Sequence, residues 1–509
     1  MEGGCRSKYD GSSYIGTLMD DSSSIKNVPN EVLARIFTTV ANSKHDVAWG
    51  LPSPVLLSSI CRHWRLLAQN TPELWINIVV PMHKSLEDCT NWTAEWIARS
   101  GILLISVVVQ VRVSRADLTN IISLLSQHSE RLRRLALHCN ISLDSSFRID
   151  VLESVFSRLK SAPNLQELIF CSQTYSSWWI NTANFSHRDY SLDFPRLTIL
   201  KMEGPIPPIS NLTSLTIGKL ITTYEVISHV FTTSPGLQHL ALYDLFPLAN
   251  QLPQDTALIR ADSLRSLAIS IHQFRPPGEN YIVNYLAMPN INYLELDGDK
   301  WSIADFGQSL FSARIDTLQI SNCSSFDADT IDFLHSLSTL RQLQLVHAST
   351  QSLLCKIESP RSLAHKTSIN LHNSSSSNQP TTPTDVDTII AIQQKRSVSA
   401  SVWPEIRTIS LDTLIAADVL NLCNFVTCHK HVEVVELSTS ARRHLSSSLH
   451  RKDNVVYERP SLFVAAGGEE GSNDVEEWLG KMVDIRAHFR VGMIESPLSV
   501  KLGRSRDLF

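Results

Sequence analysis

The sequence predicts an α/β fold, an irregular solenoid with parallel strands on its concave side and helices outside. Three observations support this prediction. A short apolar phrase recurs along most of the chain, helix-like stretches lie between its copies, and two amphipathic helical patterns precede the first copy. With 509 residues, of which 43% are hydrophobic, the chain has enough apolar material for an extended array.

Two helical patterns lie between Val28 and Trp75. The first has Pro just inside the helix start and Glu31 in the first turn, where an acid suits the positive end of the helix dipole. Its apolar residues predict a single helix face: Val32, Leu33, Ile36 and Phe37. The second has the same period in Leu56, Leu57, Ile60, Cys61, Trp64, Leu67 and Ala68. Two helices this short cannot enclose a core alone, so we expect apolar surface to remain for another partner.

This pair of patterns, VPNEVLARIF followed by CRHWRLLAQNTPELW, resembles an F-box. The resemblance covers about fifty residues and implies docking onto a Skp-type adaptor, and through it a cullin scaffold, of a ubiquitin ligase. The adaptor-binding residues that it implies are Val28, Pro29, Leu33, Ile36, Phe37, Ile60, Cys61 and Trp64. Val28 stands where the family more often has Leu, and the spacer from Ala41 to Pro52 is longer than in the shortest members. The alternative interpretation is a helical hairpin that caps a larger domain.

A strand, helix, strand and helix are predicted next. Ile76, Ile78 and Val80 alternate as in a strand. The helix runs from about Ser85 to Ser100, with Gly101 ending it and an inner face of Leu86, Trp92, Trp96 and Ile97. Leu103 to Val109 is a β-branched run, and Ala116 to Gln127 is helical in pattern.

The recurring phrase is an apolar residue, two variable residues, then two apolar residues separated by one. Its copies begin at Leu132, Leu165, Leu197, Leu212, Leu237, Leu264, Ile291, Ile315, Leu340, Ile406 and Val432. From Leu212 to Leu340 the starts are 25, 27, 27, 24 and 25 residues apart, the range of leucine-rich repeats. We expect each phrase to be a strand with its last two apolar residues facing the core. Helices are expected between phrases, at Tyr224–Thr233, Tyr281–Ala287, Ile303–Phe311 and Asp329–Leu337.

The whole arrangement resembles the large fungal families of F-box proteins with leucine-rich repeats. The predicted organisation is a disordered segment 1–26, an F-box at 27–75, a solenoid at 76–450 and a C-terminal cap and tail at 451–509. A disordered insertion is expected around 348–402, because Asn373–Thr384 lacks apolar residues. In the C-terminal part, the pattern predicts a capping amphipathic helix from about Asp474 to Phe489.

Composition argues against several classes of function. The formal net charge is −5 with mixed signs, so neither nucleic acid nor a membrane surface is an expected partner. The nine scattered cysteines and the polar N-terminus favour a cytoplasmic or nuclear protein with reduced thiols. Neither a phosphate-binding loop nor a nucleophile elbow is present, so we predict no enzyme activity, no cofactor and no metal.

The concave face is the predicted site for a protein substrate. In each phrase, the residue between the last two apolar positions and the residue after them point away from the core. The predicted substrate-binding residues are His138, Lys201, Glu203, Tyr243, Glu295, Asp297, Gln319, Gln344, Asp412 and Glu436. Acids outnumber bases here, which favours a substrate with a basic segment. The predicted function is therefore a ubiquitin-ligase substrate receptor; the alternative is a repeat scaffold without a role in ubiquitination.

Overall fold

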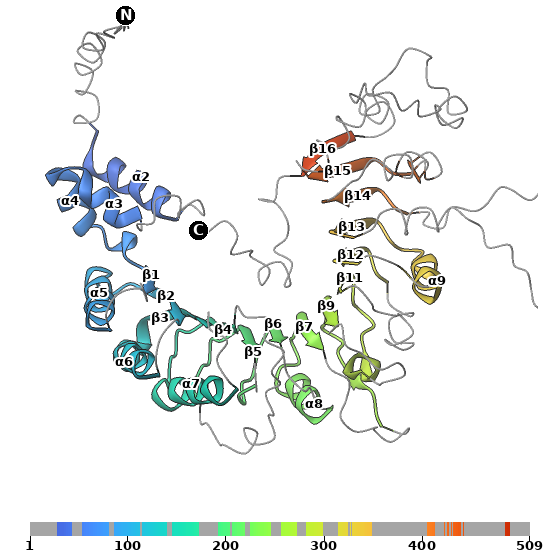
Figure 1. Ribbon diagram of the computed structural model, residues 1–509, viewed down its shortest axis with the longest axis horizontal. Helices are drawn as coiled ribbons and strands as arrows, with labels where there is room; N and C mark the ends of the chain where they lie inside the picture. The colour runs from blue at the N-terminus through green and yellow to red at the C-terminus, as the bar shows by residue number, and fades with distance from the viewer. Residues whose placement is uncertain are drawn as a thin grey trace, which may run out of the picture.

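The described residues form an arc with strands along its inner side and helices along its outer side (Figure 1). The computed structural model describes residues 28–42, 53–80, 86–111, 115–139, 145–172, 192–203, 206–218, 224–245, 256–271, 281–298, 314–323, 326, 328–348, 405–412, 422, 425–426, 429, 431–438, 441 and 484–488. The predicted segment 1–26, most of the insertion 348–402 and most of 451–509 lie outside these residues. The mixed α/β architecture with one large parallel sheet is confirmed.

Three helices and a short 3₁₀ helix begin the described chain. They are α2 (Asn30–Asn42), α3 (Ser53–Ile60), α4 (Arg62–Gln69) and η2 (Pro72–Leu74). The helix α2 packs against α3, α4 and η2. Helix α2 matches the first predicted helix, whereas the second predicted helix is divided at Cys61 into α3 and α4. All three helices stand at the end of the arc next to the first strand (Figure 1).

Fourteen parallel strands form one sheet in the order of the chain. They are β1 (Asn77–Val80), β2 (Ile105–Val111), β3 (Leu132–Cys139), β4 (Glu167–Ser172), β5 (Ile199–Glu203), β6 (Ser214–Gly218), β7 (His239–Leu245), β9 (Ser266–Ile271), β11 (Tyr293–Asp297), β12 (Thr317–Ser321), β13 (Gln342–Val346), β14 (Thr408–Leu411), β15 (Val434–Ser438) and β16 (Asp484–His488). A second sheet pairs the two-residue strands β8 (Ile259–Arg260) and β10 (Leu286–Ala287). Strands adjacent in the large sheet are adjacent in the repeat order, as a solenoid requires.

Every copy of the predicted phrase supplies one strand of the large sheet, and all three of its apolar positions are buried. In the phrase that begins at Leu264, for example, Leu264, Leu267 and Ile269 are each at most 1% exposed. The matching residues of neighbouring strands stand side by side in register, as Leu267 does with Leu294. Burial at about 25 cal/mol per Å² of apolar area makes these stacked rows the main stabilising term of the solenoid.

A tight turn and a backbone ladder position each strand. In the turn before β7, the N–H of Leu237 donates to the carbonyl oxygen of Ser234 at 3.1 Å, with Pro235 at the second turn position, which its fixed φ favours. The same turn precedes β4 and β5. One residue before each strand, main-chain hydrogen bonds already join neighbours, as from Arg265 N–H to Gln238 O at 2.8 Å. In these repeats proline ends the preceding segment and forms the turn from which the strand starts.

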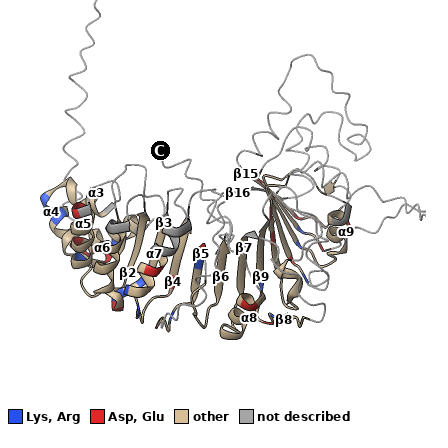
Figure 2. Ribbon diagram, turned by 60° about the horizontal axis from the view of Figure 1, so that its bottom comes forward, with Lys and Arg blue, Asp and Glu red and all other residues tan. Residues whose placement is uncertain are grey.

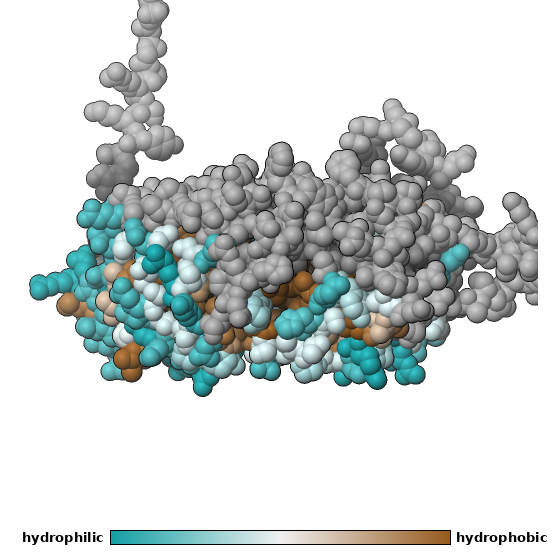
Figure 3. Space-filling model, turned by 90° about the horizontal axis from the view of Figure 1, so that it is seen from below, coloured by the Kyte–Doolittle hydropathy of each residue, from teal (hydrophilic) through white to brown (hydrophobic). Residues whose placement is uncertain are grey.

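The outer layer is made of helices of unequal length. It contains α5 (Leu86–Arg99), α6 (Arg115–Ser126), η3 (Ser129–Arg131), α7 (Ser145–Arg158), α8 (Tyr224–Thr233), η5 (Ile282–Tyr285) and α9 (Ala328–Ser336). The predictions for α5, α6, α8 and α9 are correct to within a few residues. The helix predicted at Tyr281–Ala287 is only a 3₁₀ turn followed by β10, and Ile303–Phe311 lies outside the described residues. Figure 3 shows hydrophilic and hydrophobic side chains mixed over the described part of this outer surface.

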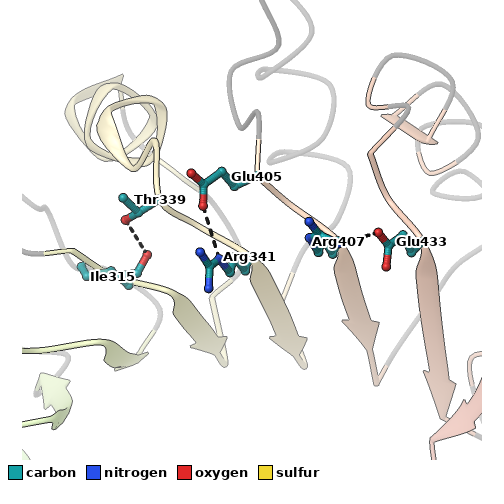
Figure 4. Close-up of polar contacts among 6 residues, drawn as sticks. All are labelled: Ile315, Thr339, Arg341, Glu405, Arg407 and Glu433. Atoms are coloured by element: carbon teal, nitrogen blue, oxygen red, sulfur yellow. Dashed lines mark hydrogen bonds and ion pairs between the residues drawn. The ribbon is translucent and has the colours of Figure 1, made fainter.

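The insertion before β14 leaves the ladder unbroken. The N–H of Arg407 donates to Arg341 O at 2.9 Å, although 66 positions separate them, and β13 and β14 pair in register. Two ion pairs lie along this step, Arg341 Nε to Glu405 Oε2 at 3.3 Å and Arg407 Nη1 to Glu433 Oε1 at 2.7 Å (Figure 4). Looping out extra residues costs little because closure entropy grows only with the logarithm of loop length.

The C-terminal helix prediction is wrong for residues 484–488. These residues form strand β16, which pairs with β15 and places Ile485 beside buried Val435 and Ala487 beside buried Leu437. The apolar residues of this segment fit a period of two as well as a helical one. The unpaired edge of β15 offers main-chain hydrogen bonds that a helix would leave unused, which accounts for the strand.

A cluster around Trp75 joins the N-terminal helices to the solenoid. Trp75 is fully buried, and its indole N–H donates to Ala68 O at 2.8 Å. Its ring meets Trp96 of α5 edge-on with 5.0 Å between centroids, and the guanidinium of Arg99 lies 4.4 Å from it. One side chain thus contacts both α4 and α5, so the two parts share one core. Among the described residues, no helix has the length and apolar character needed to cross a membrane.

Replacing Trp75 should weaken this joint strongly. We expect Trp75→Ala to lower the free energy of unfolding by about 3–5 kcal/mol, since it removes a fully buried ring. Trp75→Phe should cost about 1 kcal/mol, because it loses chiefly the hydrogen bond to Ala68. Urea denaturation monitored by circular dichroism measures both. Ile102→Ala, at a side chain that is 93% exposed, is the control and should change little; equal midpoints for Trp75→Ala and wild type would contradict this account of the joint.

Candidate interaction surfaces

The first candidate surface lies on the N-terminal helices, whose interior uses part of the predicted apolar face. Leu33 is 3% and Phe37 1% exposed, and both belong to the main core. The ring of Phe37 packs on Trp64 of α4 with 4.7 Å between centroids. These contacts hold α2 against α4. Leu33 and Phe37 were predicted to face an adaptor, and burial makes that prediction wrong for direct contact.

A second stripe of α2 faces solvent instead. Val32, Ile36 and Val40 recur every four residues and are 47%, 48% and 44% exposed. We call these three residues the α2 stripe. Ile60 at the end of α3 and Leu66 on α4 are 60% and 52% exposed. Hydrophobic surface is visible at this end of the arc in Figure 3. Exposed apolar side chains that recur at a helical spacing are typical of a binding surface for another protein.

The remaining predicted adaptor residues differ in exposure. Pro29, Ile36, Ile60 and Cys61 are exposed, whereas Val28 and Trp64 are half-buried and pack against the core. Val32 and Ile36 had been assigned to the same face as Leu33 and Phe37. In fact the two pairs lie on adjacent stripes about 100° apart around the helix. Val40 and Leu66 were missed because they lie outside the family pattern.

The bend between α3 and α4 has a local cause. Cys61 is extended, with φ −153° and ψ 170°, and its Sγ accepts the N–H of Trp64 at 3.4 Å as the N-cap of α4. The guanidinium Nε of Arg65 donates to Ser58 O at 3.0 Å, which satisfies a carbonyl at the end of α3. The cap and this hydrogen bond fix the angle at which Ile60 and Leu66 are presented.

The second candidate surface is the inner face of the sheet. The ten predicted substrate-binding residues stand at its strand positions, away from the apolar core. None of them is exposed, however. Five are half-buried, namely His138, Lys201, Asp297, Gln344 and Glu436, and five are buried, namely Glu203, Tyr243, Glu295, Gln319 and Asp412.

A polar network runs across β11 and β12 on this face. The amide nitrogen of Gln319 lies 3.0 Å from Glu295 Oε1 and 3.2 Å from Ser321 Oγ. The hydroxyl of Tyr293 lies 3.2 Å from both Glu295 Oε2 and Gln319 Oε1. Glu295 is 1% exposed, and a buried carboxylate requires such donors. The network therefore holds one negative charge at a fixed place on the inner face.

Further polar contacts continue where the strands end. Asn322 donates to Asp297 Oδ1 at 2.6 Å, and His347 Nε2 lies 3.2 Å from Asp412 Oδ2. On the next pair of strands, Ser410 donates to Glu436 Oε2 at 2.6 Å. Asn322 and His347 have φ of 54° and 52°, the left-handed region that Asn tolerates better than most residues. These two residues follow β12 and β13 at the same register, so one backbone bend is repeated in successive turns.

Burial and charge shift the ionisation of groups on the inner face. Burial raises the pKa of Tyr243 far above its usual range, and the nearby carboxylate of Glu295 raises it further. Burial lowers the pKa of His138, with added repulsion from Arg134 and Lys201. Acids thus dominate around Tyr243, and bases lie near β3 and β5. Figure 2 shows both signs interspersed along the described ribbon, without a stripe of one sign.

The described residues offer no group of three His, Cys, Asp or Glu side chains placed to hold a metal ion. Ser438 donates to the main-chain oxygen of Asp412.

Comparisons with known proteins leave the family open. No family model matches the chain, and no curated protein matches it either. Among solved structures, the chain is similar to a crystal structure of a Bacteroides fragilis protein from a structural genomics consortium. That structure is 12% identical, with 77% of this chain and 76% of the other covered, at a TM-score of 0.28.

The lowered pKa of His138 predicts weaker folding in mild acid. Below pH 6.5 the unfolded chain takes up a proton that the folded chain resists, so stability falls as pH falls. We expect His138→Gln to remove part of this slope between pH 6.5 and 5, at most about 1.4 kcal/mol per pH unit for one proton. Urea midpoints measured from pH 8 to 5 test it. Parallel curves for the two proteins over the whole range would refute the assignment to His138.

Proposed function

We propose that this chain is a substrate-recognition subunit of a Skp–cullin–F-box ubiquitin ligase. In this proposal the N-terminal helices dock a Skp-type adaptor, and the repeat array, which resembles leucine-rich repeats, binds a protein substrate. The observation that carries the proposal is the placement of exposed apolar residues. Of the eight large hydrophobic side chains exposed among the described residues, five lie on α2, α3 and α4: Val32, Ile36, Val40, Ile60 and Leu66.

This clustering is informative because the helical unit already has an interior. Leu33, Phe37 and Ala68 supply its core, so the exposed residues are surplus to folding. Fully burying an aliphatic side chain of this size gains about 1.5–3 kcal/mol. A partner that covers the α2 stripe together with Ile60 or Leu66 therefore gains enough for specific association. The F-box-like sequence string falls on these same helices.

The joint at Trp75 gives the second part of the argument. A receptor works by holding its substrate near the transfer machinery, which raises the effective concentration of the reacting groups. That effect needs a stiff connection between the adaptor-binding unit and the substrate-binding unit. The shared core of Trp75, Trp96 and Arg99 supplies such a connection. The ubiquitin-transfer chemistry then belongs to recruited proteins, and the proposed role is cytoplasmic or nuclear.

The proposed substrate contacts the inner face of the sheet through a basic segment. Among the predicted contact residues, the acids Asp297 and Glu436 are half-buried, and Glu295 and Asp412 are buried. Lys201 is the one lysine or arginine in this set. Complementary charge raises the rate of encounter and selects among partners. The alternative, a repeat scaffold outside ubiquitination, uses the same face but has no need of the α2 stripe.

Adaptor binding should depend on the α2 stripe. We expect Ile36→Glu to weaken binding of a purified Skp-type adaptor at least about tenfold, since it places a charge where about 2 kcal/mol of apolar contact forms. Titration calorimetry with the full chain measures the change. Leu33→Glu is a poor test because Leu33 is buried and its loss would unfold the helices.

Ile102→Glu is the matched control, as the same substitution at a side chain that is 93% exposed on another part of the chain. It should bind the adaptor like the wild type. If the wild-type chain does not bind the adaptor, or if Ile36→Glu binds equally well, the ligase proposal fails and the scaffold alternative is favoured.

A further inference from the structure

The inner face of the sheet is buried although the described helices lie on its outer side or, for α2, α3 and α4, at the end of the arc (Figure 1). Thr216 is 5% exposed, Gln319 4%, Glu203 2% and Glu295 1%. Side chains on an open sheet face keep solvent on one side, and carboxylates are almost never fully buried without partners. Another segment must therefore lie over this face.

The covered face has a mixed chemistry. An apolar cluster separate from the main core, Ala241, Tyr243 and Ala268, lies on β7 and β9. Acidic side chains stand on both sides of it, Glu203 on β5 and Glu295 and Asp297 on β11. Burial raises the pKa of Tyr243, and the charges of these acids raise it further. A fitting occupant therefore alternates apolar and basic residues.

We propose that residues 489–509 of this chain occupy the inner face of the sheet. This segment carries four bases, Arg490, Lys501, Arg504 and Arg506, against the two acids Glu495 and Asp507. Its apolar residues are interspersed with them: Phe489, Val491, Met493, Ile494, Leu498, Val500, Leu502, Leu508 and Phe509. It thus matches both the acids and the apolar cluster of the face.

Length and direction also suit this segment. It begins directly after β16, whose last residue His488 stands beside Ser438 at the end of β15. From β16 to β5 there are nine strand-to-strand steps, about 43 Å at about 4.8 Å each. An extended segment of 21 residues spans about 70 Å at about 3.3 Å per residue. Residues 489–509 therefore reach the whole acidic part of the face.

The insertion at 348–402 is a weaker candidate for the same place. Its five bases and three acids give the same net charge spread over 55 residues, and its centre is a run of Ser, Asn, Thr and Pro. Its apolar residues make up a smaller share of the segment than in 489–509 and lie on either side of this polar run. Charge density and apolar content both favour 489–509.

This inference rests on the proposed use of the inner face but not on adaptor binding. A substrate with a basic segment competes with residues 489–509, so the chain carries its own competitor for the site. Capture of the substrate then depends on displacing this segment. Because the contact is electrostatic in part, added salt shifts the balance toward the open face.

Carboxylate labelling of the full chain tests the proposal. A water-soluble carbodiimide with glycine ethyl ester modifies accessible carboxylates, and mass spectrometry of peptides gives the extent at Glu295, Asp297 and Glu436. The double variant Arg504→Glu, Arg506→Glu should increase labelling there about tenfold, the change that about 1.4 kcal/mol produces. Labelling of exposed Glu31 and Glu73 should stay constant. A synthetic peptide of residues 489–509, added to this variant, should restore protection.

Arg158→Glu, Lys160→Glu is the matched control, since it reverses two exposed bases at the end of α7, on the outer side of the arc. It should label like the wild type. The proposal is overturned if the tail variant labels like the wild type, or if the control variant opens the face equally. Unchanged labelling in the tail variant would assign the cover to residues 348–402 or a second copy of the chain. None of these outcomes alters adaptor binding, so the two proposals fail separately.

Discussion

Three apolar side chains per strand, stacked in register on those of the neighbouring strands, are the contacts on which the rest of this structure depends. Leu267 stands beside Leu294, and Leu294 beside Leu318, in one continuous row. No single strand and helix encloses a core, so each repeat is stable only between its neighbours. The first repeat has no preceding repeat to cover its apolar side, and the helices around Trp75 cover it before β1. The same contact that stabilises the array therefore attaches the helical unit.

The strands were predictable because their signal is local. An apolar residue at the first, fourth and sixth positions of a phrase determines which side of the strand is buried, whatever lies beyond it. The outer layer was less predictable, since a helix, a 3₁₀ turn or a short strand each spans the gap between two strands. Tyr281–Ala287 has an apolar pattern that suits a helix, but pairing of Leu286 with Ile259 made its last part a strand. The sequence pattern predicts a helix at residues 484–488, but pairing with the open edge of β15 makes them a strand.

The proposed adaptor surface shows what helical periodicity alone can and cannot predict. Val32 and Leu33 are neighbours in sequence, as are Ile36 and Phe37, and either stripe is apolar enough to face inward. The position of α4 determines which stripe is buried, because the ring of Trp64 packs on Phe37. The F-box-like pattern covers α2, yet within this helix it combines residues that build the interior with residues that remain outside. A partner can contact the exposed side chains of Val32 and Ile36 without unfolding α2.

The inner face raises a different question, because alternation places a side chain on a face but cannot tell what covers that face. Cover depends on contacts between distant segments, for which the strand pattern carries no signal. The cost of burying a carboxylate limits which segments can cover the face. Glu295 accepts a hydrogen bond from Gln319, lies close to the hydroxyl of Tyr293 and is 1% exposed, so its carboxylate stands at a buried place on the face. A face that keeps such a charge buried favours an occupant that supplies the opposite sign. In both proposals for this face, the tail and the substrate, the occupant brings basic side chains toward the acids of β5, β11 and β15 and toward Asp412, which follows β14.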